Sequence, residues 1–208
     1  MPSDDFAGDK KAPMVSPLAT IEKKFIQANV AKFPVWIGTH HLTLLTLLWS
    51  GGMLLFGYLA RVCDNLHWFW GGSVMLFLQW FTDSFDGALG RLRDRGLVKW
   101  GYYMDHLLDF VFMWCVPVSY VFVVSPDKQW MVFTVAFLYG ALMVNSFLEF
   151  SITNSFKITY LGMGPTEIRL AFIVVNTFLI FKGPGFLEAA LPWMIGILSA
   201  GLAIVIYG

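Results

Sequence analysis

Four aspartates close together in the sequence indicate a site that does chemistry. They lie within the 27 residues from position 83 to position 109. On a helix, Asp83 and Asp86 share one face because they are three residues apart. Asp105 and Asp109 are four residues apart and share a face in the same way. The surrounding segments are apolar enough for a lipid bilayer, where a carboxylate at the centre costs roughly 2.5–3.5 kcal/mol on insertion scales, so these acids indicate a functional site.

An antiparallel hairpin of two helices would bring the two pairs together. If its turn falls near Leu92–Val98, a rise of about 1.5 Å per residue places both pairs at similar depth, roughly 9–17 Å from the turn. Gly87, Gly90 and Gly101 fall on or near the same faces. Glycines at these positions leave room for close helix approach or for a ligand.

Clustered carboxylates without a neighbouring cysteine are hard oxygen ligands, which suit Mg²⁺, Mn²⁺ or Ca²⁺ rather than zinc. Two divalent ions would neutralise four carboxylates, and a two-metal site suits displacement at phosphorus. Arg91, one turn beyond the first glycines, could hold a phosphate or diphosphate. We therefore expect two divalent cations, Mg²⁺ or Mn²⁺, on Asp83, Asp86, Asp105 and Asp109.

This stretch resembles the signature of the CDP-alcohol phosphotransferases, integral membrane enzymes of phospholipid synthesis. Their pattern is D-x2-D-G-x2-A-R, then eight or nine residues, then G-x3-D-x3-D. The chain matches each fixed position except Gly90, where the family usually has alanine, and the residue there stays small. The resemblance implies a membrane-embedded homodimer that binds a CDP-linked substrate and an alcohol acceptor, one of them a lipid. It also implies that the substrate is bound by Gly87, Gly90, Arg91 and Gly101.

The activity implied by the resemblance is magnesium-dependent transfer of a substituted phosphate from the CDP-linked donor to an alcohol hydroxyl, with release of CMP. Our first choice of donor is CDP-diacylglycerol with a small polar acceptor, because the chain is short. The alternative donor is CDP-choline or CDP-ethanolamine, with diacylglycerol as acceptor. An acid-lined membrane cation transporter is the alternative of another class, but it would not need the glycines and Arg91 at these spacings.

Two residues are candidates for the catalytic base. Asp109 occupies the fourth acidic position, which the wider family uses as general base. His106 follows Asp105 in an arrangement, D-H-x-x-D, that resembles the eukaryotic choline and ethanolamine phosphotransferases, where this histidine is a candidate base. One residue on along a helix, however, turns it about 100° away from Asp105, so a simple polar contact is the alternative role.

Three further residues are possible acceptor or phosphate contacts. His40 lies in the segment Thr39–Thr43, where many relatives have Pro-Asn-x-Leu-Thr. Lys157 lies beside the fourth predicted span. Arg169 lies one turn into an apolar helix and needs an anionic partner, either Glu167 or a substrate phosphate.

The composition places the chain in the membrane class. It has 208 residues, 57% of them hydrophobic and only 13% charged, and its length suits one domain. The net charge is zero, and without a basic patch we expect no nucleic acid partner. Cys63 and Cys115 have no metal-like spacing and are interpreted as small apolar residues.

Hydropathy predicts an all-α membrane protein with six transmembrane helices. We divide the chain into a cytoplasmic segment, residues 1–38, and a six-helix catalytic domain, residues 39–208. The first segment contains an amphipathic surface helix, with Leu18, Ile21 and Phe25 on its apolar face; a helix docked on the protein is the alternative. The predicted spans are Leu42–Ala60, Trp68–Leu92, Gly101–Val124, Gln129–Phe150, Gly164–Phe181 and Ala189–Tyr207.

The distribution of lysine and arginine predicts the orientation. With the N-terminus inside, eleven of these residues fall on the cytoplasmic side and three on the other. We therefore expect a multi-pass protein of the cytoplasmic (inner) membrane, with both termini and the acidic site facing the cytoplasm.

Overall fold

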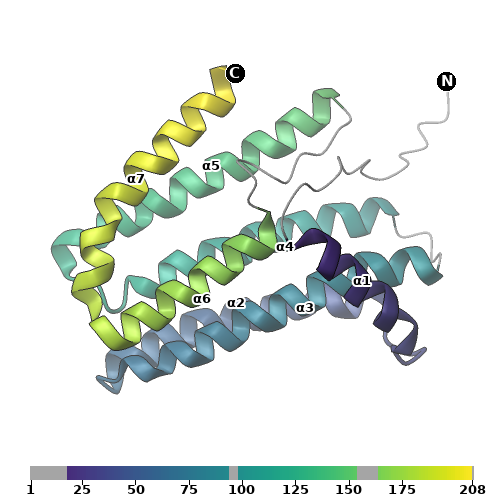
Figure 1. Cartoon of the computed structure of the whole chain (residues 1–208), viewed down its shortest axis with the longest axis horizontal. Helices are drawn as coiled ribbons and strands as arrows, with labels where there is room; N and C mark the ends of the chain where they lie inside the picture. The colour runs from purple at the N-terminus through teal and green to yellow at the C-terminus, as the bar shows by residue number, and fades with distance from the viewer. Residues whose placement is uncertain (1–17, 94–97, 154–163, 208) are drawn as a thin grey trace.

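The computed structural model describes residues 18–93, 98–153 and 164–207, and these residues form helices without any strand (Figure 1). A short helix, α1 (Ala19–Asn29), precedes six long ones. Three single 3₁₀ turns lie between helices: η1 (Val30–Lys32), η2 (Leu66–Trp68) and η3 (Pro126–Lys128). The long helices are α2 (Thr39–Val62), α3 (Phe69–Arg93), α4 (Val98–Tyr120), α5 (Gln129–Thr153), α6 (Pro165–Lys182) and α7 (Pro184–Tyr207).

Each of the six predicted spans overlaps one long helix, which confirms the all-helical class, although the span predicted to end at Val124 ends as a helix at Tyr120. Three segments are long and apolar enough to cross a membrane by length and composition: Thr39–Val62, Pro126–Ile152 and Pro184–Tyr207. The other three helices, α3, α4 and α6, carry the aspartates and Arg169, which make them less apolar. Their crossing of the membrane, and so the count of six spans, stays a prediction.

Helix α2 lies between α3 and α4 and packs along both of them. As a result α3 and α4 touch each other little, so the predicted hairpin is open rather than closely packed. Helix α6 packs on α3, while α5 packs on α4 and α7 (Figure 1). The main core is apolar and includes Met53 of α2, Phe69 and Leu76 of α3, and Phe112 of α4, all buried. The acidic stretch is thus carried by two helices that a third holds apart.

Helix α1 docks against one end of this bundle. Phe25 stacks on Trp80 of α3, with ring centroids 6.3 Å apart, and meets the edge of Phe85 at 5.8 Å. On its outer side Ile21 is 66% exposed, although it is a large apolar residue. The helix therefore contacts the protein and also leaves apolar surface uncovered. Its position on a membrane surface stays a prediction.

Candidate active site

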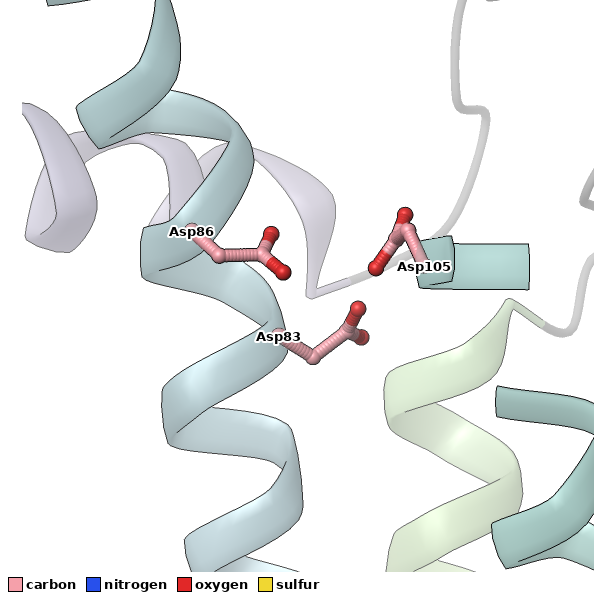
Figure 2. Close-up of side chains that lie close together, drawn as sticks. All are labelled: Asp83, Asp86 and Asp105. Atoms are coloured by element: carbon pink, nitrogen blue, oxygen red, sulfur yellow. The ribbon is translucent and has the colours of Figure 1, made fainter. Parts of the chain in front are cut away.

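Three of the four aspartates converge between α3 and α4. Asp83 and Asp86 extend from α3 toward Asp105 of α4 (Figure 2). One carboxylate oxygen from each lies within 4.8 Å of the other two. Asp86 is buried, with 4% of its surface exposed, and the other two are half-buried. The spacing on each helix therefore produces the cluster that the sequence predicted from these three residues.

The central helix α2 fixes the most buried of these acids. The hydroxyl of Thr43 lies 2.9 Å from Oδ2 of Asp86 and 3.1 Å from the carbonyl oxygen of Thr39, one turn earlier. Thr43 is itself buried. A hydrogen bond from a rigid helix restricts the rotation of the carboxylate, so α2 contributes to the site although it carries no acidic residue.

Asp109 lies outside the group of three and has different neighbours. Its Oδ1 accepts a hydrogen bond of 2.7 Å from Nε2 of Gln79, a residue of α3. The same oxygen lies 3.6 Å from Nη2 of Arg169 on α6. Metal binding by Asp109 stays a prediction, and the structure adds an amide and a guanidinium as its direct neighbours.

The anionic partner of Arg169 is Asp83. Its Nη2 donates a hydrogen bond of 2.8 Å to Oδ2 of Asp83, and its side chain is 5% exposed. From the sequence alone, either Glu167 or a substrate phosphate is expected in this role. Glu167 instead accepts hydrogen bonds from the backbone amides of Gly164 and Leu18, where it caps the first turn of α6.

The ring of His106 packs toward α5, while its Nδ1 lies near Asp105. Its Nδ1 donates to the carbonyl oxygen of Tyr102, one turn earlier, at 2.7 Å. Its ring lies 4.2 Å from that of Tyr102 and meets the edge of Phe147 at 5.4 Å. The distance from Nδ1 to Oδ2 of Asp105 is 4.0 Å. This orientation agrees with the rotation expected for a residue one position beyond Asp105.

The signature glycines have three different surroundings. A Cβ atom at Gly87 would lie 3.4 Å from Nη1 of Arg91, so the exposed arginine folds back over this glycine. A Cβ atom at Gly90 would lie 3.2 Å from Oγ1 of Thr39, at the start of α2. At Gly101 no atom lies within 4 Å of that position among the described residues. Gly90 thus serves helix packing, whereas Gly101 faces open space.

Two of the remaining candidates are less informative. His40 is half-buried at the start of α2, with its ring 4.0 Å from that of His41. Nδ1 of His41 accepts a hydrogen bond from the backbone amide of Gly38 and caps the helix. Lys157 lies outside the described residues.

Sequence analysis missed several residues that position the site. Thr43 and Gln79 contact Asp86 and Asp109 directly. The carboxylate of Glu22 in α1 accepts one hydrogen bond from Ser84 at 2.8 Å and another from Thr166 at 2.7 Å, and so links α3 to α6. Gln79 had a detectable signal, because it is an uncharged amide within an apolar run one turn before Asp83. Thr43 had a signal too, because it matches the threonine of the Pro-Asn-x-Leu-Thr segment. The contacts of Glu22 had none, since they depend on which helices are neighbours.

The electrostatics of the cluster favour a bound cation. At an effective dielectric constant of about 20, two carboxylates with oxygens 4.8 Å apart repel each other by roughly 3 kcal/mol. Arg169 supplies a single positive charge beside them. Three converging carboxylate oxygens are the donor set that Mg²⁺ and Mn²⁺ prefer, so Asp83, Asp86 and Asp105 fit a divalent metal ion.

Comparison with known proteins agrees with the geometry. A search of curated proteins finds no match to the chain. Comparison with protein families, in contrast, matches residues 39–205, which cover all eight signature positions from Asp83 to Asp109 and most of the chain. The chain therefore belongs to the CDP-alcohol phosphatidyltransferase family, whose members transfer substituted phosphate groups.

Proposed function

We propose that the protein transfers a phosphatidyl group from CDP-diacylglycerol to the hydroxyl of a small polar alcohol, with Mg²⁺ or Mn²⁺ as cofactor and CMP as the second product. Because members of this family are transferases, we favour an enzyme over the alternative of an acid-lined cation transporter. The observation that carries the proposal is the convergence of Asp83, Asp86 and Asp105 within 4.8 Å, on helices of a membrane protein.

The charges of the site support two cations rather than one. Four carboxylates and the Arg169 guanidinium give a formal charge of −3 (−4 plus +1). One divalent cation would leave the site negative, and it would repel the diphosphate of the donor. Two divalent cations would make the formal charge of the site +1, and a positive site attracts a diphosphate. In this arrangement Asp83, Asp86 and Asp105 hold the ions, with Asp109 as the fourth ligand.

The bound cations would supply positive charge against the diphosphate oxygens. The chain's own residues do the rest. Thr43 keeps the Asp86 carboxylate in place, and Arg91 over Gly87 offers a guanidinium to a phosphate. The open space at Gly101 leaves room for a substrate group. Asp109 receives the proton of the acceptor hydroxyl as the new phosphorus–oxygen bond forms and the bond to CMP breaks.

The second candidate activity uses CDP-choline or CDP-ethanolamine as donor and diacylglycerol as acceptor. His106 is the feature that favours it. The hydrogen bond from His106 to Tyr102 and the packing of its ring against Phe147 support a structural role for the imidazole. We therefore retain Asp109 as base and CDP-diacylglycerol as donor. His40 and Lys157 remain candidates for contact with the acceptor.

We further propose that the site faces the cytoplasm, with both termini on that side and residues 1–38 forming a separate surface segment. The positive-inside count supports this orientation, and Arg91 and Arg93 stand at the site end of α3. The enzyme would act as a homodimer, as its family resemblance implies.

Release of CMP from purified protein tests the function. The assay combines Mg²⁺ and CDP-diacylglycerol with serine, glycerol phosphate or inositol phosphate, and in parallel CDP-choline or CDP-ethanolamine with diacylglycerol. We expect CMP in the first group only. Product in the second group alone would reverse the donor assignment, and no product with any donor would contradict the proposed function.

A further inference from the structure

Gln79 is a buried polar residue with an unusual balance of contacts. It lies on α3 one turn before Asp83, and none of its surface is exposed. Its Nε2 donates to Oδ1 of Asp109 at 2.7 Å. Its Oε1 is also buried and has no hydrogen-bond partner in the part of the chain that the structure describes. A buried amide oxygen without a donor is unfavourable, so stable packing alone does not account for glutamine at this position.

An apolar residue of the same size would fill this space without leaving an unpaired oxygen. Methionine has nearly the volume of glutamine and adapts to irregular gaps. What methionine lacks is the hydrogen bond to Asp109. Glutamine therefore differs from methionine at this position by its hydrogen bond to Asp109, a residue of the proposed active site.

The neighbouring guanidinium explains why Asp109 needs such a contact. Nη2 of Arg169 lies 2.8 Å from Asp83 and 3.6 Å from Asp109, so it stands between the two carboxylates. An ion pair with Arg169 would draw the Asp109 carboxylate toward α6. The 2.7 Å hydrogen bond from Gln79 holds the same oxygen from the side of α3.

We propose that Gln79 is a positioning residue for the transfer reaction. Its amide orients the Asp109 carboxylate and keeps it from closing onto Arg169, so that Asp109 can receive the proton of the acceptor hydroxyl. The inference rests on the proposed function, because it assigns Gln79 to the base of that reaction.

The variant Gln79→Met tests the role, with kcat, KM for each substrate and the thermal midpoint as readouts. We expect kcat to fall about 10- to 100-fold, at or below the low end of what a positioned acid–base group supplies, because the variant displaces the base rather than removing it. KM for the CDP-linked donor should rise less than kcat falls, since Gln79 contacts Asp109, the proposed fourth ligand, and not the three converging carboxylates. The thermal midpoint should stay equal or rise. Losing the hydrogen bond destabilises the fold, and removing the unpaired buried oxygen stabilises it by a comparable free energy.

Thr82→Val is the matched control on the same helix. The Thr82 hydroxyl is buried and accepts a hydrogen bond of 3.2 Å from Nε1 of Trp49. It also lies within hydrogen-bond distance of the backbone carbonyls of Leu78 and Gln79, but it does not bond the Gln79 side-chain amide that contacts Asp109. Its loss leaves the indole N–H without this partner, so the thermal midpoint should fall while kcat stays within about twofold. The two variants thus separate positioning from packing.

Three results would overturn the proposal. In the first, Gln79→Met keeps the kcat of the unmodified protein. In the second, both Gln79→Met and Gln79→Leu fail to fold or lose thermal stability in proportion to activity, which makes Gln79 a packing residue. In the third, the unmodified protein releases no CMP, and the proposed function then fails together with this inference.

Discussion

The two ends of the bundle both bury polar side chains, yet they use them differently. At the end where α2 turns into α3, Tyr120 donates to Asn176 at 2.7 Å, and Asn176 donates to Ser73 at 3.1 Å. These residues come from α4, α6 and α3, and all are buried. At the other end, three carboxylates crowd within 4.8 Å. Buried atoms of Gln79 and Arg169 there have no hydrogen-bond partner among the described residues.

This difference separates stability from activity. The network of Tyr120, Asn176 and Ser73, which we call the closing network, joins three helices through satisfied hydrogen bonds. The acidic end keeps like charges together, which opposes folding but prepares a site for cations and a diphosphate. Changes at the acidic end should therefore remove activity with little loss of stability, and changes at the closing network should do the reverse.

Removal of divalent cations should have the largest effect. Excess chelator is expected to abolish CMP release and to lower the thermal midpoint, because the ions bind the folded site and offset its negative charge. Addition of Mg²⁺ or Mn²⁺ should restore both. A variant in the closing network, such as Asn176→Leu, should show the same shift on chelation from its own lower starting point. Full turnover in chelator after dialysis would contradict the metal assignment.

Asp86→Asn should reduce CMP release at least about 1,000-fold, the upper end for loss of one preorganised electrostatic contact. Asn keeps the shape and can still accept a hydrogen bond from Thr43, which now binds Asp86 at 2.9 Å. Because one of three crowded charges is gone, the thermal midpoint without metal should stay equal or rise. A variant that loses activity only because it unfolds would remove the contrast between the two ends.

Substitution of the two candidate bases should have the next largest effect on kcat. His106→Ala should lose about 10- to 100-fold in kcat, and Asp109→Ala should lose more, since it removes the proposed base and a proposed metal ligand together. The smaller loss in His106→Ala is expected because the imidazole is hydrogen-bonded to Tyr102 and packed on Phe147. Measurement of kcat together with metal affinity distinguishes them. Complete loss in His106→Ala with unchanged metal affinity would move the base to the histidine and favour diacylglycerol as acceptor.

The closing network should respond in stability alone. Asn176→Leu leaves the buried Tyr120 hydroxyl without its 2.7 Å acceptor, a loss of about 1–3 kcal/mol. For a chain of this size that corresponds to roughly 2–12 °C in thermal midpoint. We expect kcat to remain within about twofold when it is measured below the lowered midpoint. A tenfold fall in kcat at full folding would mean that the two ends are coupled.

The sequence predicted the acidic end well because its information is local. The spacing of Asp83 and Asp86 places both on one face of a helix, and the predicted antiparallel hairpin brings Asp105 of the next helix toward them. The apolar runs likewise predicted a long helix at each of six places. Both predictions need only the geometry of single helices, their hydropathy and the pairing of two helices that follow each other in the chain.

The rest depends on which helices become neighbours, and a pattern along one helix does not contain that information. The insertion of α2 between α3 and α4 brought Thr43 to Asp86. The packing of α6 on α3 gave Arg169 its partner Asp83, where the sequence suggested Glu167 or a phosphate. The closing network was missed for the same reason, since its residues lie on three helices far apart in the chain.

Gly90→Ala should have the smallest effect and compares the packing of the two ends directly. A Cβ atom there would lie 3.2 Å from Oγ1 of Thr39, a side-chain atom that can shift by a few tenths of an ångström. Replacing a glycine inside a helix stabilises it by about 0.5–1 kcal/mol. The gain slightly exceeds the contact penalty, so the thermal midpoint should rise by less than about 4 °C, with kcat within about twofold.

Gly57→Ala is the counterpart of this substitution at the closing-network end. Its Cβ atom would overlap the carbonyl oxygen of Ser119, which belongs to the backbone of α4 and cannot move alone. Overpacking of this kind costs about 1–3 kcal/mol, so this variant should lose thermal stability. If Gly90→Ala instead loses tenfold or more in activity while staying folded, the glycine admits the substrate. Gly90 would then belong to the open face of the site with Gly101 rather than to the contact between α3 and α2.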